Sequence, residues 1–161
     1  MLWHLKNGVL DHLNPKVWLI LIGSNDMFVN FCTDRFVLAD ILNVLKYLQT
    51  SRPEAQFIVH GILPRLDPVP ESKGQTKGLL GRYWKRSQVI NAQLKRFCET
   101  HNHLHFMQAG SFFLEETDLK GRRRINATLM EDGIHPTVEG LRVWGQKIAE
   151  MVNKTIKEAK K

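Results

Sequence analysis

The sequence predicts one α/β domain over residues 1–161, built on a parallel sheet with helices on both faces. Residues 17–22 form an uninterrupted apolar run, which is typical of a parallel strand buried on both faces. Strand-like segments alternate with helix-period segments along the chain, as they do in α/β folds. The length and the 43% hydrophobic content are those of a globular domain with a core of its own.

Each expected element follows from a hydrophobic pattern and a stop signal. Helices are predicted where apolar residues recur every three or four positions, and prolines end two of them. Thr33 is expected to cap the second helix. The predicted helices cover residues 2–13, 34–50, 81–100 and a long final segment after Thr137. The predicted strands cover residues 17–22, 56–63 and 104–107, and residues 112–129 are expected to be irregular or briefly helical.

A short stretch before the last helix contains an acid and a histidine. Asp132 and His135 are three residues apart, and Thr137 is a suitable N-cap for the following helix. Gly133 permits a tight turn, and Pro136 stiffens the chain after His135. Such a turn can hold a carboxylate against the imidazole Nδ1–H, which is the base-and-orienter half of a Ser-His-Asp system. The alternative is a polar helix cap in which both side chains only satisfy backbone groups.

A second polar stretch, Gly23-Ser24-Asn25-Asp26, directly follows the apolar run 17–22. Ligands in open α/β sheets gather at the carboxyl ends of such strands. The side-chain amide of Asn25 is therefore in a position from which it can donate a hydrogen bond to an oxyanion.

Together these two stretches resemble the SGNH, or GDSL-type, ester hydrolase family. The order and spacing of Gly23-Ser24-Asn25-Asp26 and Asp132-Gly133-Ile134-His135 carry the resemblance. The segments Leu-Trp-His-Leu-Lys-Asn-Gly at 2–8 and Gly-Ile-Leu-Pro-Arg at 61–65 look similar to the platelet-activating-factor acetylhydrolase branch of this family. The resemblance extends from Leu2 to the last helix.

The resemblance implies a three-layer, flavodoxin-like sandwich with strand order 2-1-3-4-5. This chain would supply strands 3, 4 and 5 and lack the first two, which leaves residues 17–22 at the sheet edge. An apolar edge of that kind is expected to aggregate, to dimerise or to require a partner strand. The long connection 64–80 follows a strand's carboxyl end, and it is expected either to border the substrate pocket or to be disordered.

The resemblance also implies an incomplete catalytic site. The family's nucleophile is the serine of a Gly-Asp-Ser motif, and this sequence contains no Gly-Asp-Ser. In a complete relative, His135 would transfer the proton, Asp132 would orient His135, and Asn25 would donate to the oxyanion. Ser24 fills the variable position before Asn25, so no nucleophile is assigned in this chain. The pocket candidates are Gly23, Ser24, Asp26 and Arg65, and Arg65 is either an anion-binding group or an ordinary surface arginine. The resemblance implies a small ester substrate and no metal or cofactor.

Three functions are therefore weighed. The first is a serine ester hydrolase for acyl or lipid esters, present here as an incomplete chain. The second is a non-catalytic relative that binds or pairs, as a homodimer or with a related subunit. The third is a basic nucleic-acid-binding domain, suggested by a net charge of +7 concentrated at 120–124 and in the basic tail 154–161. The third ranks last, because the Arg run has few aromatic neighbours on which bases would stack.

Other polar residues are assigned structural roles. His60 lies among apolar residues of the second predicted strand and is expected to be a packed core histidine. His103 and His105 form a His-x-His pair that can hold zinc, but no further well-spaced ligand accompanies them. Cys32 and Cys98 give no disulfide framework. No apolar run approaches the roughly 20 residues of a membrane span, and the first residues lack a signal-peptide pattern, so a cytoplasmic location is expected.

Overall fold

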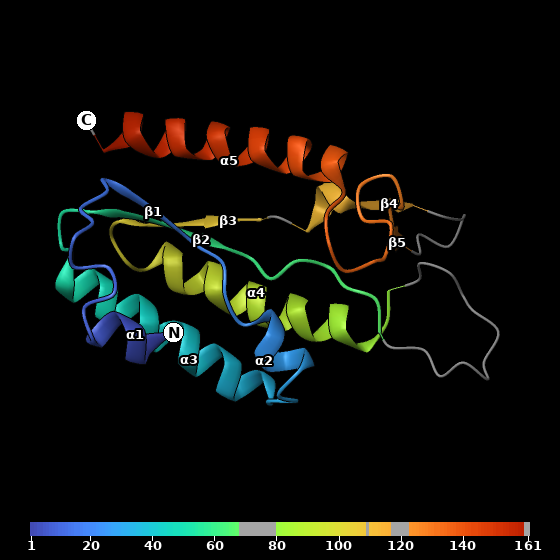
Figure 1. Ribbon diagram of the computed structural model, residues 1–161, viewed down its shortest axis with the longest axis horizontal. Coiled ribbons are helices and arrows are strands. Elements are labelled where there is room, and N and C mark those ends of the chain that lie inside the picture. The colour runs from blue at the N-terminus through green and yellow to red at the C-terminus, as the bar shows by residue number, and fades with distance from the viewer. Residues whose placement is uncertain (68–79, 109, 117–122, 160–161) are drawn as a thin grey trace.

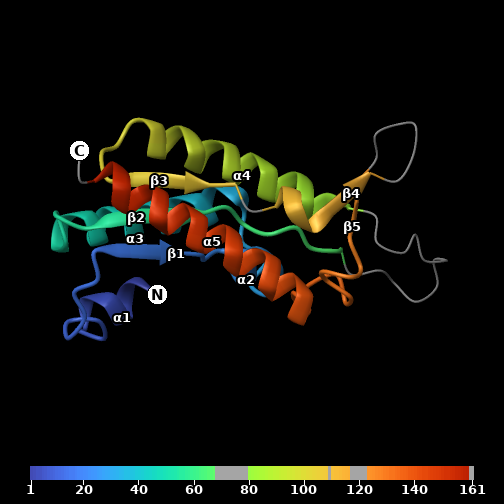
Figure 2. The same ribbon diagram turned by 90° about the horizontal axis from the view of Figure 1, so that it is seen from above.

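Three parallel strands lie between two helical layers in the computed structural model (Figures 1 and 2). The structure describes residues 1–67, 80–108, 110–116 and 123–159. The sheet has the order β1-β2-β3 and consists of β1 (Val17–Ile20), β2 (Gln56–His60) and β3 (Leu104–Met107). Both strand pairs are parallel, with Trp18 opposite Phe57 and Ile58 opposite His105. The predicted α/β class with a parallel sheet is confirmed.

The long helices divide between the two faces of the sheet. Figure 1 shows α5 (Val138–Glu158) on one face and α3 (Asp34–Ser51) with α4 (Arg82–Glu99) on the other. The core packs mainly between the sheet and α3 and α4, where the apolar positions expected from helical spacing are buried. On α3 these are Val37, Ile41, Val44, Leu45 and Leu48. Residues 154–158 of the basic tail form the last turns of α5.

The shorter elements lie at the ends of the sheet. They are α1 (Leu2–Lys6), α2 (Ser24–Phe28), the 3₁₀ turn η1 (Ser111–Phe113), β4 (Leu114–Glu116) and β5 (Arg123–Ile125). The strands β4 and β5 pair antiparallel, and Phe113, Ile125 and Met130 form a second small core beside them. This strand pair was not predicted, because its two strands are three residues long and lack alternation.

Several predicted boundaries are wrong. The first helix ends at Lys6 and not at residue 13, because the chain turns at Gly8, where φ is +80°. The first strand ends at Ile20, two residues early. The second ends at His60, and beyond it the buried Asn91 side chain replaces the strand partner: it accepts from the Ile62 N–H at 2.7 Å and donates to the Ile62 carbonyl at 3.0 Å. Most of the predicted connection 64–80 lies outside the described residues.

The carboxyl ends of the three strands point to the same end of the molecule. Figure 2 shows α2, the β4–β5 pair and the N-terminal end of α5 gathered at that end. Among the described strands, β1 pairs on one side only, with β2. The predicted edge position of this strand is therefore confirmed, and the polar residues singled out above belong to segments at the carboxyl end.

Candidate active site

The turn before α5 brings Asp132 and His135 into direct contact. Asp132 Oδ1 accepts from the backbone N–H groups of Ile134 and His135, both at 2.7 Å. Asp132 Oδ2 lies 2.7 Å from His135 Nδ1. A carboxylate only accepts hydrogen bonds, so Nδ1 carries the proton and Nε2 is the unprotonated nitrogen of the neutral ring. The His135 side chain is 79% exposed, which leaves its outer nitrogen open to a reacting group.

The same contacts fix the charge of Asp132. The backbone N–H of His135, together with that of Ile134 and the imidazole, favours the ionised carboxylate and lowers the pKa of Asp132 to about 2. The carboxylate is therefore ionised throughout the neutral range, as an orienting group for a histidine base must be.

Gly133 and Thr137 hold this turn in place. Gly133 has φ of +71°, and a Cβ there would overlap the side chain of Leu66, so both the conformation and the space require glycine. The Leu66 N–H donates to the Gly133 carbonyl at 3.0 Å, which ties the turn to the segment after β2. Thr137 Oγ1 accepts from the Gly140 N–H at 3.1 Å and donates to the Thr128 carbonyl at 2.7 Å. The predicted N-cap at Thr137 is confirmed.

Asn25 lies in the first turn of α2 and not in an open loop. Gly23 begins this helix with φ of +99°, and a Cβ there would lie 2.9 Å from Ile41 Cδ1, so glycine allows the chain to pass against α3. Asn25 is exposed, and its side-chain amide makes no hydrogen bond to the described residues. The geometry leaves that amide free to face solvent after β1, and it makes no hydrogen bond with the Asp132–His135 pair.

The remaining pocket candidates differ in their surroundings. Ser24 is half-buried at the start of α2. Asp26 accepts from the Asn30 side chain at 3.4 Å. Gly23 and Asp26 also line a cavity of about 310 Å³, whose other walls come from the N-terminal residues, α3 and Ile22.

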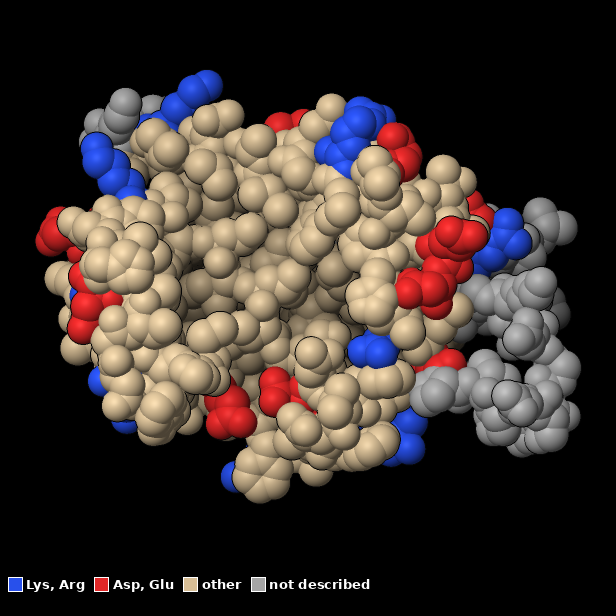
Figure 3. All heavy atoms as spheres, in the orientation of Figure 1, with Lys and Arg blue, Asp and Glu red and all other residues tan. Residues whose placement is uncertain are grey.

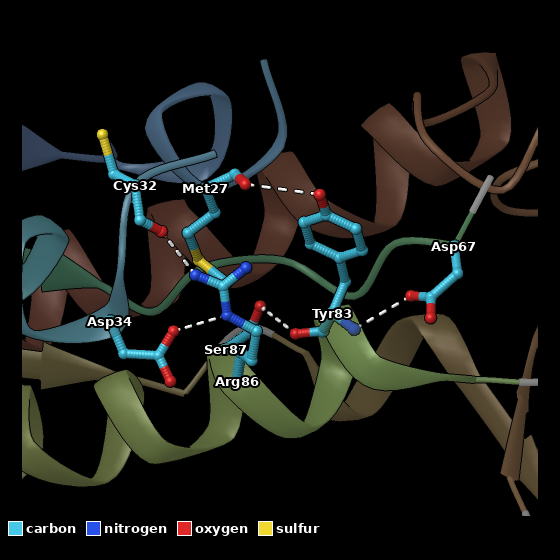
Figure 4. Close-up of polar contacts among 7 residues, drawn as sticks. All are labelled: Met27, Cys32, Asp34, Asp67, Tyr83, Arg86 and Ser87. Atoms are coloured by element: carbon cyan, nitrogen blue, oxygen red, sulfur yellow. Dashed lines mark hydrogen bonds and ion pairs between the residues drawn. The ribbon is translucent and has the colours of Figure 1, made fainter. Parts of the chain in front are cut away.

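Side chains of α4 fasten the segment that carries Asn25 (Figure 4). The Tyr83 hydroxyl donates to the Met27 carbonyl at 3.3 Å. Arg86 donates to the Asp34 carboxylate and to the Cys32 carbonyl, both at 2.5 Å. Asp67, from the segment after β2, accepts from the backbone N–H of Tyr83 at 2.9 Å and so caps α4. These contacts were not predicted, since they join segments between 16 and 56 residues apart and no local spacing indicates them.

Arg65 lies between α2 and the Asp132–His135 turn. Its guanidinium carbon is 3.1 Å from the centre of the Phe28 ring, and that ring packs against Tyr83 with centroids 5.0 Å apart. Burial lowers the pKa of Arg65, and the nearby Tyr83 and Asp132 oppose that shift. Arg65 is thus neither an isolated surface side chain nor a member of an ion pair within the described residues.

The other histidines have structural surroundings. His60 is 2% exposed and is confirmed as a core histidine; its Nδ1–H donates to the Gly61 carbonyl at 2.7 Å, and its Nε2 accepts from Trp144 Nε1 at 2.8 Å. His103 and His105 both contact the Gln56 side chain, at 2.6 and 2.8 Å. Within the described residues, no group of three or more His, Cys, Asp or Glu side chains is placed to hold a metal ion.

Comparison with known proteins identifies the family. The model of the GDSL-like Lipase/Acylhydrolase family matches residues 2–143. The chain belongs to this family. A 65-residue segment is 38% identical to the platelet-activating factor acetylhydrolase IB subunit alpha2 of Gallus gallus, covering 40% of this chain and 27% of that subunit. The human subunit alpha1 is 26% identical over 114 residues, covering 71% of this chain and 43% of that subunit. The matches thus span less than half the length of these relatives.

Solved structures share the fold of this GDSL-like chain. A provisionally assigned acylhydrolase from Bacteroides fragilis superposes with a TM-score of 0.70 at 22% identity, covering 96% of this chain and 68% of that one. A carbohydrate esterase family 3 protein from Talaromyces cellulolyticus gives 0.62 at 16% identity, covering 92% and 62%. The family and fold inferred from the two sequence stretches are confirmed. Among the described residues, no helix is long and apolar enough to cross a bilayer.

Proposed function

We propose that this chain carries the base and oxyanion groups of a serine ester hydrolase. The observation that carries the proposal is the Asp132–His135 pair, joined at 2.7 Å with the outer ring nitrogen exposed, at the carboxyl end of a parallel sheet. The nucleophile would come from a Gly-Asp-Ser segment that is absent from this sequence. Membership of the GDSL-like family supports this division of roles.

In the proposed reaction, His135 transfers a proton in each of two steps, the acylation of the serine and the hydrolysis of the acyl-enzyme. Nε2 accepts the serine hydroxyl proton while the serine oxygen bonds to the ester carbonyl carbon, and the tetrahedral intermediate forms. The imidazolium then returns the proton to the leaving alcohol as the acyl–oxygen bond breaks. Water repeats the sequence on the acyl-enzyme and releases the carboxylic acid. Asp132 keeps Nδ1 protonated, so that Nε2 is the nitrogen that works.

Asn25 is proposed to stabilise the oxyanion of the intermediate. Its amide N–H is exposed on α2 and has no hydrogen-bond partner among the described residues, so it has a free donor. A preorganised donor of this kind acts most strongly on the charge that develops in the transition state. Gly23, Ser24 and Asp26 are proposed to border the same pocket.

The names of the relatives suggest a substrate class and a kind of partner for this chain. These relatives are called platelet-activating factor acetylhydrolase subunits, so we propose a short-chain acyl ester as substrate and a related subunit or second copy as partner. A cytoplasmic location stays a prediction.

The test restores the nucleophile. We expect that a fusion of this chain to an N-terminal segment with the two missing strands and the Gly-Asp-Ser turn of the family will hydrolyse an activated acetyl ester with a stoichiometric acyl-enzyme burst. His135→Ala should reduce turnover by orders of magnitude, and Asn25→Ala should raise the barrier by about 2.7–4 kcal/mol. The exposed His103, which contacts Gln56, provides the matched control His103→Ala. A folded, active fusion that keeps most activity without His135 would refute the proposal.

A second candidate is a non-catalytic pairing subunit. The absence of Gly-Asp-Ser from the sequence favours it. Reading the genomic sequence upstream of Met1 separates the two candidates: an in-frame Gly-Asp-Ser supports the hydrolase, and a stop codon without one supports the pairing subunit.

A further inference from the structure

Arg65 is a cation beside the candidate site whose charge no acid among the described residues neutralises. None of its nitrogens makes a hydrogen bond or ion pair with those residues. Its Nε is buried and has no hydrogen-bond partner. Burying a polar N–H without an acceptor is unfavourable. The arrangement is one that a bound acceptor would stabilise.

The surroundings of Arg65 fix where that acceptor would bind. The guanidinium carbon lies 3.1 Å from the centre of the Phe28 ring, which is one helical turn beyond Asn25 on α2 and also packs against Tyr83. The next residue, Leu66, is bonded to Gly133 in the turn that holds Asp132 and His135. Because Phe28 covers one face of the guanidinium, an acceptor would approach its N–H groups in the guanidinium plane.

The location also explains why no protein acid is needed there. Asp132 is close enough to influence the pKa of Arg65, but its two oxygens are taken by backbone N–H groups and by His135. The positive charge of Arg65 is therefore not neutralised by a salt bridge to Asp132. By contrast, Arg86 on α4 donates to the Asp34 carboxylate and to the Cys32 carbonyl.

We propose that Arg65 is an oxyanion-binding residue of the site, which takes a carboxylate or phosphate group of the ligand next to His135. This inference rests on the proposed function, since it assigns a ligand class to the same site. A carboxylate would be the acid released from the ester, and a phosphate would belong to the alcohol portion of the substrate. A planar guanidinium binds either group through paired N–H donors.

The test measures binding to the chain as it exists, which requires no nucleophile. Acetate and inorganic phosphate are titrated separately, while the His135 ring signals and the Arg65 Nε–H signal are followed by NMR. We expect saturable binding of at least one anion that shifts both sets of signals. Arg65→Met retains an apolar stem over Phe28 but removes the donors and the charge, and it should weaken binding roughly tenfold or more. Arg96→Met, at an exposed position of α4, is the matched control and should bind as the wild type does.

Each outcome decides the matter. Binding of acetate alone identifies a site for the acid product, and binding of phosphate alone identifies a site for a phosphate-bearing substrate. Either result supports the proposal. Equal binding by Arg65→Met and wild type, with an unchanged thermal melt, would overturn it, as would anion binding that leaves the His135 signals unmoved or no saturable binding at all. Loss of hydrolysis in the fusion protein with Arg65-dependent binding intact would refute the proposed function alone.

Discussion

At the scale of single residues, the candidate site depends on one carboxylate that makes three contacts. Asp132 orders the backbone of the turn through Oδ1 and holds the imidazole through Oδ2. Its ionised form is favoured by the same groups, which lower its pKa to about 2. The turn and the histidine tautomer are therefore two consequences of one charge.

Asp132→Asn separates these consequences. The amide oxygen can still accept from the backbone, but the amide nitrogen cannot accept from Nδ1–H, so the Nε2–H tautomer of His135 should become dominant. Nitrogen-15 NMR of the imidazole at neutral pH measures this directly. Wild type should show Nδ1–H, and the exposed His103 ring should be unaffected by the substitution. An unchanged His135 tautomer would contradict the proposed orienting role.

At the scale of elements, a hydrogen bond between the buried His60 and the half-buried Trp144 joins α5 to the sheet. His60 on β2 donates from Nδ1 to its neighbouring carbonyl and accepts at Nε2 from the Trp144 indole. Trp144 also packs edge-on against His60 and Phe113. Since α5 begins at the Asp132–His135 turn, this pair helps to position the turn above the sheet.

The pair predicts a pH dependence of stability. Burial lowers the folded-state pKa of His60 from the ordinary value of 6.5, so the unfolded chain takes up the proton first. The stabilisation is complete above about pH 6.5 and is lost as the pH falls below it toward the lowered pKa. Thermal melts between pH 8 and 5 should show this fall. His60→Gln should flatten it, and His101→Gln at an exposed position should not. The pKa of His105 is also lowered by burial, so part of the slope should remain.

At the scale of the whole molecule, one edge of the sheet is uncovered. Leu19 of β1 is 40% exposed, and β1 pairs with β2 alone among the described strands. Figure 3 shows a broad uncharged surface on this side, hollowed near its centre, with charged side chains at its margin. Burying one Leu or Ile side chain contributes about 1.5–3 kcal/mol, so several uncovered ones are significant against a domain stability of about 5–15 kcal/mol.

We therefore expect the chain alone to self-associate through the β1 edge, as unprotected edges with unpaired backbone groups do. Sedimentation velocity over a concentration series should show dimers or larger species. Leu19→Lys places a charge on this edge and should shift the distribution toward monomer. Val89→Lys, at an exposed apolar position on α4, is the control and should have little effect. A wild-type monomer with a sharp cooperative melt would show that the edge is tolerated.

The sequence by itself determined what depends on near neighbours in the chain. The parallel strands, the buried positions of α3 and the Thr137 cap follow from periodicity and capping residues within a few positions. The contact between Asp132 and His135 is of the same kind, because the two residues are three apart with Gly133 between them. The sequence alone also shows that it contains no Gly-Asp-Ser nucleophile motif.

Only the tertiary structure decided which distant segments meet. Arg65 lies over Phe28, Asn91 replaces a strand partner for Ile62, and Trp144 reaches His60 across 84 positions of sequence. No local pattern encodes these pairs, because each results from two elements packing at a given angle and depth. A polar side chain then pairs with a group that lies next to it in space. In the interior it must pair, since an unpaired buried polar group is unfavourable.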